Sequence, residues 1–206
     1  MTKKKRVAER GRRNIFGFKN YYKESWDFLK ESKKFIFASV GIFFILFLLG
    51  LILPTPQFVL DIVIDMVKKL LEETQGKGFF EMWFFIFKNN LIVAFVSVLF
   101  GCSLGIIPLL YLFGNGYFIG VVSRMVTSET SIFELWRLIP HGIFELPAIF
   151  ISFGLGIKIG SFVFYENPYK KLKEFYIKSF KVFIFIIIPL LFVAAFIEAG
   201  LIVFMG

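Results

Sequence analysis

The chain has 206 residues, a formal net charge of +9 and 57% hydrophobic residues, among them 31 phenylalanines. This apolar content exceeds what one soluble core of this length can cover, so a soluble globular domain is excluded and an integral membrane protein is predicted. The basic excess flanks apolar runs, which favours anionic lipid headgroups, above all at the N-terminus, and argues against nucleic acid as a partner. Its two clusters comprise Lys3, Lys4, Lys5, Arg6, Arg10, Arg12 and Arg13, and Lys170, Lys171, Lys173, Lys178 and Lys181.

Residues 1–34 are predicted to form a basic cytoplasmic or interfacial segment, and residues 35–206 a single transmembrane domain. Residues 14–34 place aromatic side chains among lysines, a pattern suited to a helix in the membrane interface; a partly ordered basic tail is the alternative. Residues 35–53 contain no charged side chain and approach the roughly 20 residues that cross a bilayer. They end at Pro54 and Pro56, so this run is the first predicted span.

Residues 58–73 carry apolar side chains at helical spacing and charged ones on the other side, which predicts an amphipathic helix outside the hydrocarbon core. The next apolar block, residues 79–126, is too long for one crossing. A break is expected between Pro108 and Gly116, because proline removes a backbone donor and Gly114-Asn115-Gly116 is a turn signal. The remaining spans are therefore predicted at residues 90–107, 109–125, 141–162 and 179–204, the last with a kink at Pro189.

The charges of the loops test this number of spans. The loop of residues 54–81 is acidic on balance, whereas that of residues 165–181 is rich in lysine. Five spans with a cytoplasmic N-terminus and an extracytoplasmic C-terminus agree with these charges, and four do not. A re-entrant hairpin in place of spans two and three gives the same agreement. The predicted fold is an all-α, multi-pass helix bundle of the cell membrane with interfacial amphipathic helices.

Three Gly-x-x-x-Gly pairs indicate close packing of the helices. They are Gly101 with Gly105, Gly116 with Gly120, and Gly156 with Gly160. Small residues four apart let backbones touch, which matters in lipid because no hydrophobic drive brings helices together. The face of the last pair continues through Ser152 to Glu145 and His141, since positions i and i+4 stack on a helix. The spacing fits packing within one chain and also across a homodimer.

Polar side chains gather toward one end of the predicted bundle. In the five-span topology Arg124, Arg137, His141, Glu145 and Glu198 all lie within a few turns of the outer surface. A carboxylate that faces lipid is costly, and the two arginines are near enough to compensate it. These groups either tie helix ends together or serve proton or ion passage or metal binding. One histidine and one carboxylate are weak evidence for a metal, so no metal site is predicted.

Motifs of common enzymes are absent from the sequence. There is no Gly-x-Ser-x-Gly elbow, no His-Glu-x-x-His and no Walker lysine loop, and a single histidine excludes sites with two histidines. The sequence therefore predicts a protein without catalytic residues and without a cofactor.

Several motifs occur in an order typical of one family of membrane proteins. Asn89-Asn90 precedes Gly101-x-x-x-Gly105, Asn115-Gly116-x-x-x-Gly120 follows, and Pro140-His141-Gly142-x-x-Glu145-x-x-Ala148 leads into a glycine-rich span. Over residues 35–205 this pattern resembles the stage II sporulation protein M family. The resemblance implies about five helices, no known catalytic activity and, in the sporulation member, a scaffold that holds cell-wall hydrolases. It also implies a structural or binding role for the family motif, which comprises Asn115, Gly116, Pro140, His141, Gly142 and Glu145.

Two main functions follow from this reasoning, and an interfacial membrane enzyme that uses carboxylates alone is a third. The first is a non-enzymatic membrane scaffold or assembly protein that presents its interfacial segments to unknown membrane or envelope proteins. The second is a transporter or channel for ions or small solutes, in which a break at Asn115 and a polar cavity around His141 and Glu145 form a pathway. A water-filled passage from His141 toward Asn115 would favour transport, whereas a dry, packed interior would favour the scaffold.

Overall fold

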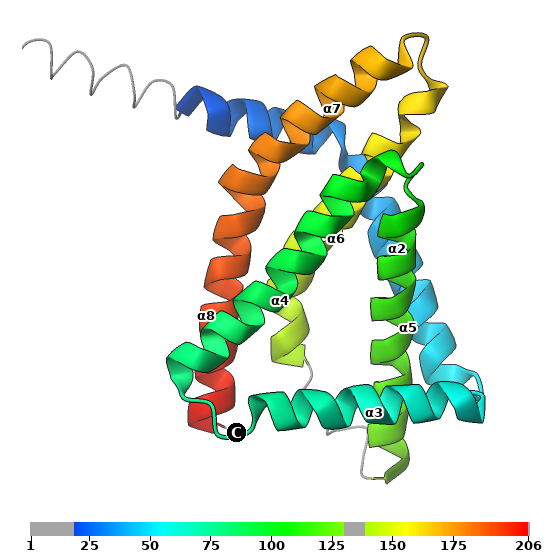
Figure 1. Ribbon diagram of the computed structural model, residues 1–206, viewed down its shortest axis with the longest axis vertical. Coiled ribbons are helices and arrows are strands. Elements are labelled where there is room, and N and C mark those ends of the chain that lie inside the picture. Colours follow the sequence, from blue (N-terminus) through cyan, green and yellow to red (C-terminus); the bar gives the residue numbers. More distant parts are fainter. Residues whose placement is uncertain (1–18, 130–138, 206) are drawn as a thin grey trace, which may run out of the picture.

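The computed structural model describes residues 19–129 and 139–205, and these residues form helices joined by short connections, without a strand (Figure 1). Five helices in this part of the chain are long and apolar enough to cross a membrane. The prediction of an all-α, multi-pass membrane bundle is therefore confirmed.

The helices follow one another with short links. After an N-terminal helix at residues 19–31, the elements are α2 (Lys33–Ile52), α3 (Gln57–Thr74), α4 (Phe79–Leu99), the 3-10 turn η1 (Phe100–Cys102), α5 (Ile106–Glu129), α6 (Ile139–Gly160), the 3-10 turn η3 (Ser161–Phe164), α7 (Pro168–Val182), the π-helical turn η4 (Phe183–Ile187) and α8 (Ile188–Met205). The segment from α7 to α8 is one continuous helical rod.

The two ends of the bundle differ in the helices that cover them. The N-terminal helix and the start of α7 lie at one end, which we call the lysine-rich side, and α3 lies across the opposite end, which we call the α3 side (Figure 1). Helices α4 and α5 each run from one side to the other, in opposite directions, and each is long and apolar enough for a full crossing, which favours two spans over a re-entrant hairpin. The lysine-rich loop and the acidic first loop thus lie at opposite ends, as five spans require.

The predicted bounds of the second span were wrong, whereas the third span, predicted at residues 109–125, lies within α5. The second begins at Phe79 instead of residue 90, and the chain turns at residues 100–105, where Leu104 and Gly105 have positive φ angles of 59° and 77°. The segment predicted to break, around Asn115 and Gly116, lies inside α5. Pro108 stands in the first turn of α5, where its missing donor is tolerated, so it marks a helix start.

The fifth span also differs from the prediction of residues 179–204. Its helix begins at Pro168, because the lysine-rich stretch that follows is amphipathic and continues directly into the apolar part. The kink expected at Pro189 corresponds to the π-helical turn at Phe183–Ile187 just before it. Proline has no backbone N–H, so the carbonyl four residues before it lacks its usual hydrogen bond. A π-helical turn accommodates this loss by changing the local hydrogen-bond pattern.

Glycines bring the helices into backbone contact within the chain. Helices α2 and α5 run side by side, and a Cβ added at Gly116 would lie 3.0 Å from the Phe43 carbonyl oxygen, while one at Gly120 would meet the Phe47 carbonyl oxygen. At the lysine-rich side, a Cβ at Gly101 would lie 2.7 Å from the Gly156 carbonyl oxygen. Gly160 in turn has no room for a Cβ against the backbone at Gly105. All three Gly-x-x-x-Gly faces are thus occupied by contacts inside one chain.

These contacts predict unequal effects of alanine within one helix. Gly120→Ala should lower the free energy of unfolding by about 1–3 kcal/mol, because the added methyl group overpacks a backbone contact. Gly114→Ala is the matched control in α5, since a Cβ there meets nothing within 4 Å. It should leave stability unchanged or raise it by up to about 1 kcal/mol. Denaturant titration in mixed micelles measures both values, and equal effects of the two substitutions would contradict the observed packing.

Candidate functional site

A polar cluster lies where α4, α6 and α8 meet. On α4 the buried residues Met82, Ile86, Ala94 and Val98 recur at every fourth position, and Asn90 occupies the place in the middle of this stripe. Residues four apart share one face of a helix, so Asn90 faces the interior of the bundle. The α4·α6, α4·α8 and α6·α8 packing then brings Asn90 to two carboxyl groups, Glu145 of α6 and Glu198 of α8.

The two carboxyl groups and the amide interact directly. The Glu145 carboxyl hydrogen-bonds with the Glu198 carboxyl and with the side chain of Asn90. Glu198 is buried, and a hydrogen bond between two carboxyl groups requires that one of them carries a proton. Oε1 of Glu145 is buried and receives no hydrogen bond from the described residues, which costs far less for a neutral carboxyl than for a carboxylate. The geometry therefore fits a pair of acids that share a proton.

The remaining residues of the predicted polar cluster lie elsewhere or outside the described part. The Arg124 guanidinium donates a hydrogen bond to the Leu53 carbonyl oxygen at the end of α2, so it ties α5 to α2. The interactions described at Glu145 involve Glu198 and Asn90, not Arg124. Arg137 lies outside the described residues, and His141 is described only as part of the α6 backbone.

The family motif is divided between two helices. Pro140, His141 and Gly142 form the first turn of α6, which leads to Glu145. Asn115 donates a hydrogen bond of 2.7 Å to the Tyr111 carbonyl oxygen of its own helix, and Gly116 packs on α2. Ser152 lies four residues after Ala148 on the same face of α6. It is buried, and its hydroxyl donates a hydrogen bond of 2.8 Å to the Ala148 carbonyl oxygen. The Asn-Gly pair therefore serves helix packing and does not open α5 toward the carboxyl pair.

A second cluster, at the lysine-rich side, is centred on Lys158 of α6. Its side chain is buried, its Nζ donates a 3.0 Å hydrogen bond to Ser32 Oγ, and it lies 4.0 Å from the centre of the Phe28 ring. The Glu31 carboxylate is 4.0 Å away. A desolvated ammonium over an aromatic ring is stabilised by the ring's quadrupole, so Lys158 holds the N-terminal helix against α6.

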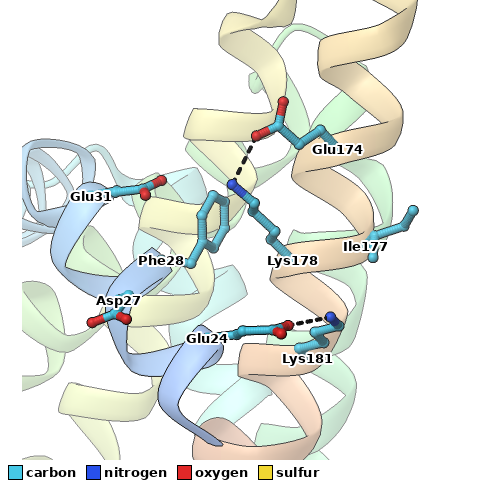
Figure 2. A pocket seen from close by; sticks show the side chains of 8 residues that line it. All are labelled: Glu24, Asp27, Phe28, Glu31, Glu174, Ile177, Lys178 and Lys181. Carbon is cyan, nitrogen blue, oxygen red and sulfur yellow. Dashed lines mark hydrogen bonds and ion pairs between the residues drawn. The ribbon is translucent and has the colours of Figure 1, made fainter. Parts of the chain in front are cut away.

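Helix α7 completes this arrangement, which we call the N-terminal clamp (Phe28, Ser32, Lys158 and Lys178). Lys178 Nζ lies 2.8 Å from Glu174 and 5.4 Å from the centre of the Phe28 ring. Lys181 pairs with Glu24 of the N-terminal helix at 2.6 Å, and both pairs are drawn in Figure 2. A cavity of about 340 Å³ remains between the two helices, lined mainly by charged side chains. Opposite charges therefore fix the N-terminal helix across α7.

Sequence reasoning missed the N-terminal clamp and the role of Asn90. Lys158 is the one lysine within the apolar run Ile143–Phe164, and a charged residue inside a span is a signal for a buried partner. Asn90 was placed at the start of a span, where an amide needs no partner. No group of three potential metal ligands from His, Cys, Asp and Glu occurs among the described residues.

The carboxyl pair predicts a small effect of glutamine at position 145. Glu145→Gln should change the free energy of unfolding by less than about 1 kcal/mol, because the amide is isosteric with a neutral acid and still bonds to Glu198. Glu145→Ala should lower it by about 1–3 kcal/mol, since Asn90 and Glu198 lose a partner. A loss of roughly 3 kcal/mol or more in the glutamine variant would contradict this, because it would indicate an ionised Glu145 paired with a cation.

The N-terminal clamp predicts that Lys158→Met loosens the N-terminal helix. Losing the cation over Phe28 should destabilise its docking by about 1–2 kcal/mol, near the value of a desolvated cation–π contact. Hydrogen exchange of residues 19–31 should therefore accelerate. Lys30→Met is the control, because Lys30 lies on the exposed surface and pairs there with Asp27 at 3.7 Å. Unchanged exchange in the Lys158 variant would show that the contacts of α7, such as the Lys181–Glu24 ion pair, hold the helix without Lys158.

Comparison with known proteins agrees with this architecture. The model of the stage II sporulation protein M family matches residues 35–201, more than half of the chain. An uncharacterized protein of Methanocaldococcus jannaschii is 35% identical over 118 residues, which are 55% of this chain and 66% of that relative, just under two thirds of its length. No solved structure matches the chain. The chain belongs to the stage II sporulation protein M family.

Proposed function

We propose that this protein is a non-enzymatic membrane scaffold or assembly factor of the stage II sporulation protein M type. The single observation that carries the proposal is the closed arrangement of the Asn90, Glu145 and Glu198 cluster, whose members bond to one another. A transport pathway needs polar groups that face a hydrated passage. Here the polar groups are engaged with each other.

The surroundings of the cluster support a packed interior. Ala148 and Ser152 on α6 and Ala195 and Ala199 on α8 are fully buried, at 0% exposure, on the faces that adjoin Glu145 and Glu198. Asn115, the other end of the passage considered from the sequence, bonds to its own helix. The cavity described above lies at the lysine-rich side, outside the line from His141 to Asn115. These features favour a scaffold over a transporter.

Helix α3 offers a surface outside the bundle that suits this function. It lies across one end of the spans (Figure 1), and Val63, at the centre of its apolar face, is buried. The flanks of that face remain exposed at Phe58, Ile62, Met66 and Leu71. An amphipathic helix in this position inserts its apolar face at the boundary of headgroups and acyl chains and leaves its charged face to water. The charged face is then available to envelope proteins.

The proposal includes an orientation. The lysine-rich side carries the N-terminal helix and α7, and basic segments favour the cytoplasmic face and its anionic lipids. The α3 side and the C-terminus would then be extracytoplasmic. Self-association remains a further expectation, although the glycine faces that suggested it are engaged within the chain.

Two measurements on the same protein test the scaffold function. Photo-crosslinkers placed at exposed positions of the α3 charged face, such as Asp65 and Lys69, should capture a defined membrane or envelope protein in cells. Liposomes that contain the purified protein should be no more permeable to ions and small solutes than empty liposomes. Recovery of no partner together with a specific flux, abolished by Glu145→Ala, would replace the scaffold with a transporter.

A further inference from the structure

Helix α4 presents an apolar outer face with a single lysine in it. Large apolar side chains are exposed at Phe80 and Phe84 in the first half of the helix and at Ile92, Phe95 and Leu99 in the second half. Lys88 stands four residues after Phe84 and four before Ile92 and is exposed as well. Residues at this spacing lie on one face of a helix, so Lys88 points away from the bundle with its apolar neighbours.

The position of Lys88 along α4 puts it deep in the span. It lies nine residues after Phe79 and eleven before Leu99, the first and last residues of the helix. At 1.5 Å per residue this is about 14 Å from the α3 side along the helix axis. A lysine near the centre of a membrane helix is costly to insert, and such residues almost always pair with another polar group.

No described residue supplies that partner within the chain. The ion pairs of the described residues involve Lys30, Lys158, Lys171, Lys178 and Lys181, and none includes Lys88. Of the acids in the adjoining spans, Glu145 interacts with Glu198 and with Asn90. Asn90 is two residues beyond Lys88, which turns its side chain about 200° around the helix, to the inner face.

We propose that the outer face of α4 binds a membrane span of another protein that carries an aspartate or glutamate at the depth of Lys88. The carboxylate and the ammonium would neutralise one another in lipid, and the flanking apolar side chains would pack along the partner helix. This inference rests on the proposed scaffold function and gives the chemistry of one partner.

A second copy of this chain does not fit the same face. A symmetric dimer contact uses the same patch on both subunits, so two copies joined at α4 would bring two Lys88 side chains together. Like charges at close range in a medium of low dielectric constant repel strongly. The face therefore selects a different protein with the opposite charge.

A defined helix can serve as the probe. The full-length protein would be labelled at Cys102, its exposed free cysteine, and reconstituted in phosphatidylcholine vesicles with a labelled polyleucine transmembrane peptide that has one central glutamate. Energy transfer should show that this peptide associates roughly three- to tenfold more tightly than the same peptide with a central glutamine. Lys88→Met should abolish the difference, and Lys69→Met, which removes one charge from α3 outside the span, should preserve it.

Other results would overturn the proposal. Equal association of the glutamate and glutamine peptides would mean that Lys88 reaches headgroups or water and needs no carboxylate. Retention of the difference in the Lys88→Met protein would place the contact on another face. Disulfide crosslinking of Phe84→Cys in a Cys102→Ser background to a second copy of the chain would show that this face is covered by self-association. Any of these leaves the scaffold test on α3 unaffected, so the two proposals fail separately.

Discussion

A polar side chain inside a bilayer has no water to bond with, and this constraint organises the structure. Asn90, Glu145 and Glu198 come from three different helices, and Glu145 interacts with the other two. Their contact fixes the relative height of α4, α6 and α8, because sliding any of these helices by one turn would expose a carboxyl group to lipid. The same constraint at the opposite end makes Lys158 hold the N-terminal helix.

Close packing of helix backbones stabilises the bundle in addition to the polar contacts. Lipid provides no hydrophobic drive between helices, so association depends on dispersion contacts along surfaces that fit. The glycines of α5 admit the α2 backbone, and those near residues 101 and 156 admit the turn between α4 and α5. The outer face of α4 and the charged face of α3 are among the surfaces that this packing leaves exposed.

Much of the fold could be predicted from apolar length and loop charge. Helix α2 begins and ends within two residues of the first predicted span. The number of five spans was predicted from the lysines that begin at Lys170, and five helices are long and apolar enough to cross a membrane. The bounds of the second span failed because Lys88 was treated as lying before the membrane, whereas helix formation depends on the backbone and tolerates one lysine. The Asn115-Gly116 pair was interpreted as a turn, but its glycine is required by contact with α2, which spacing within one segment does not reveal.

The candidate site was less accessible to sequence reasoning. Helical periodicity puts Glu145 on the packed face of its helix, and the topology puts Glu198 near the same end. Whether Asn90 reaches these two acids depends on the tilt and rotation of α4. Contacts between helices set that tilt and rotation, and the sequence of one segment does not show them. Lys158 finds its ring and hydroxyl partners only because the N-terminal helix folds back on α6 and α7, a long-range contact without a local pattern.

Infrared spectroscopy tests most directly whether the Glu145 and Glu198 pair is closed, dry and shares a proton. The protein in membranes at neutral pH should show the carbonyl stretching band of a protonated carboxyl group, absent from a Glu145→Gln, Glu198→Gln double variant. In D₂O the band should shift only slowly, because the pair is shielded from water. Absence of the band, or a shift complete at the first time point, would contradict the account and place the two acids in a hydrated passage.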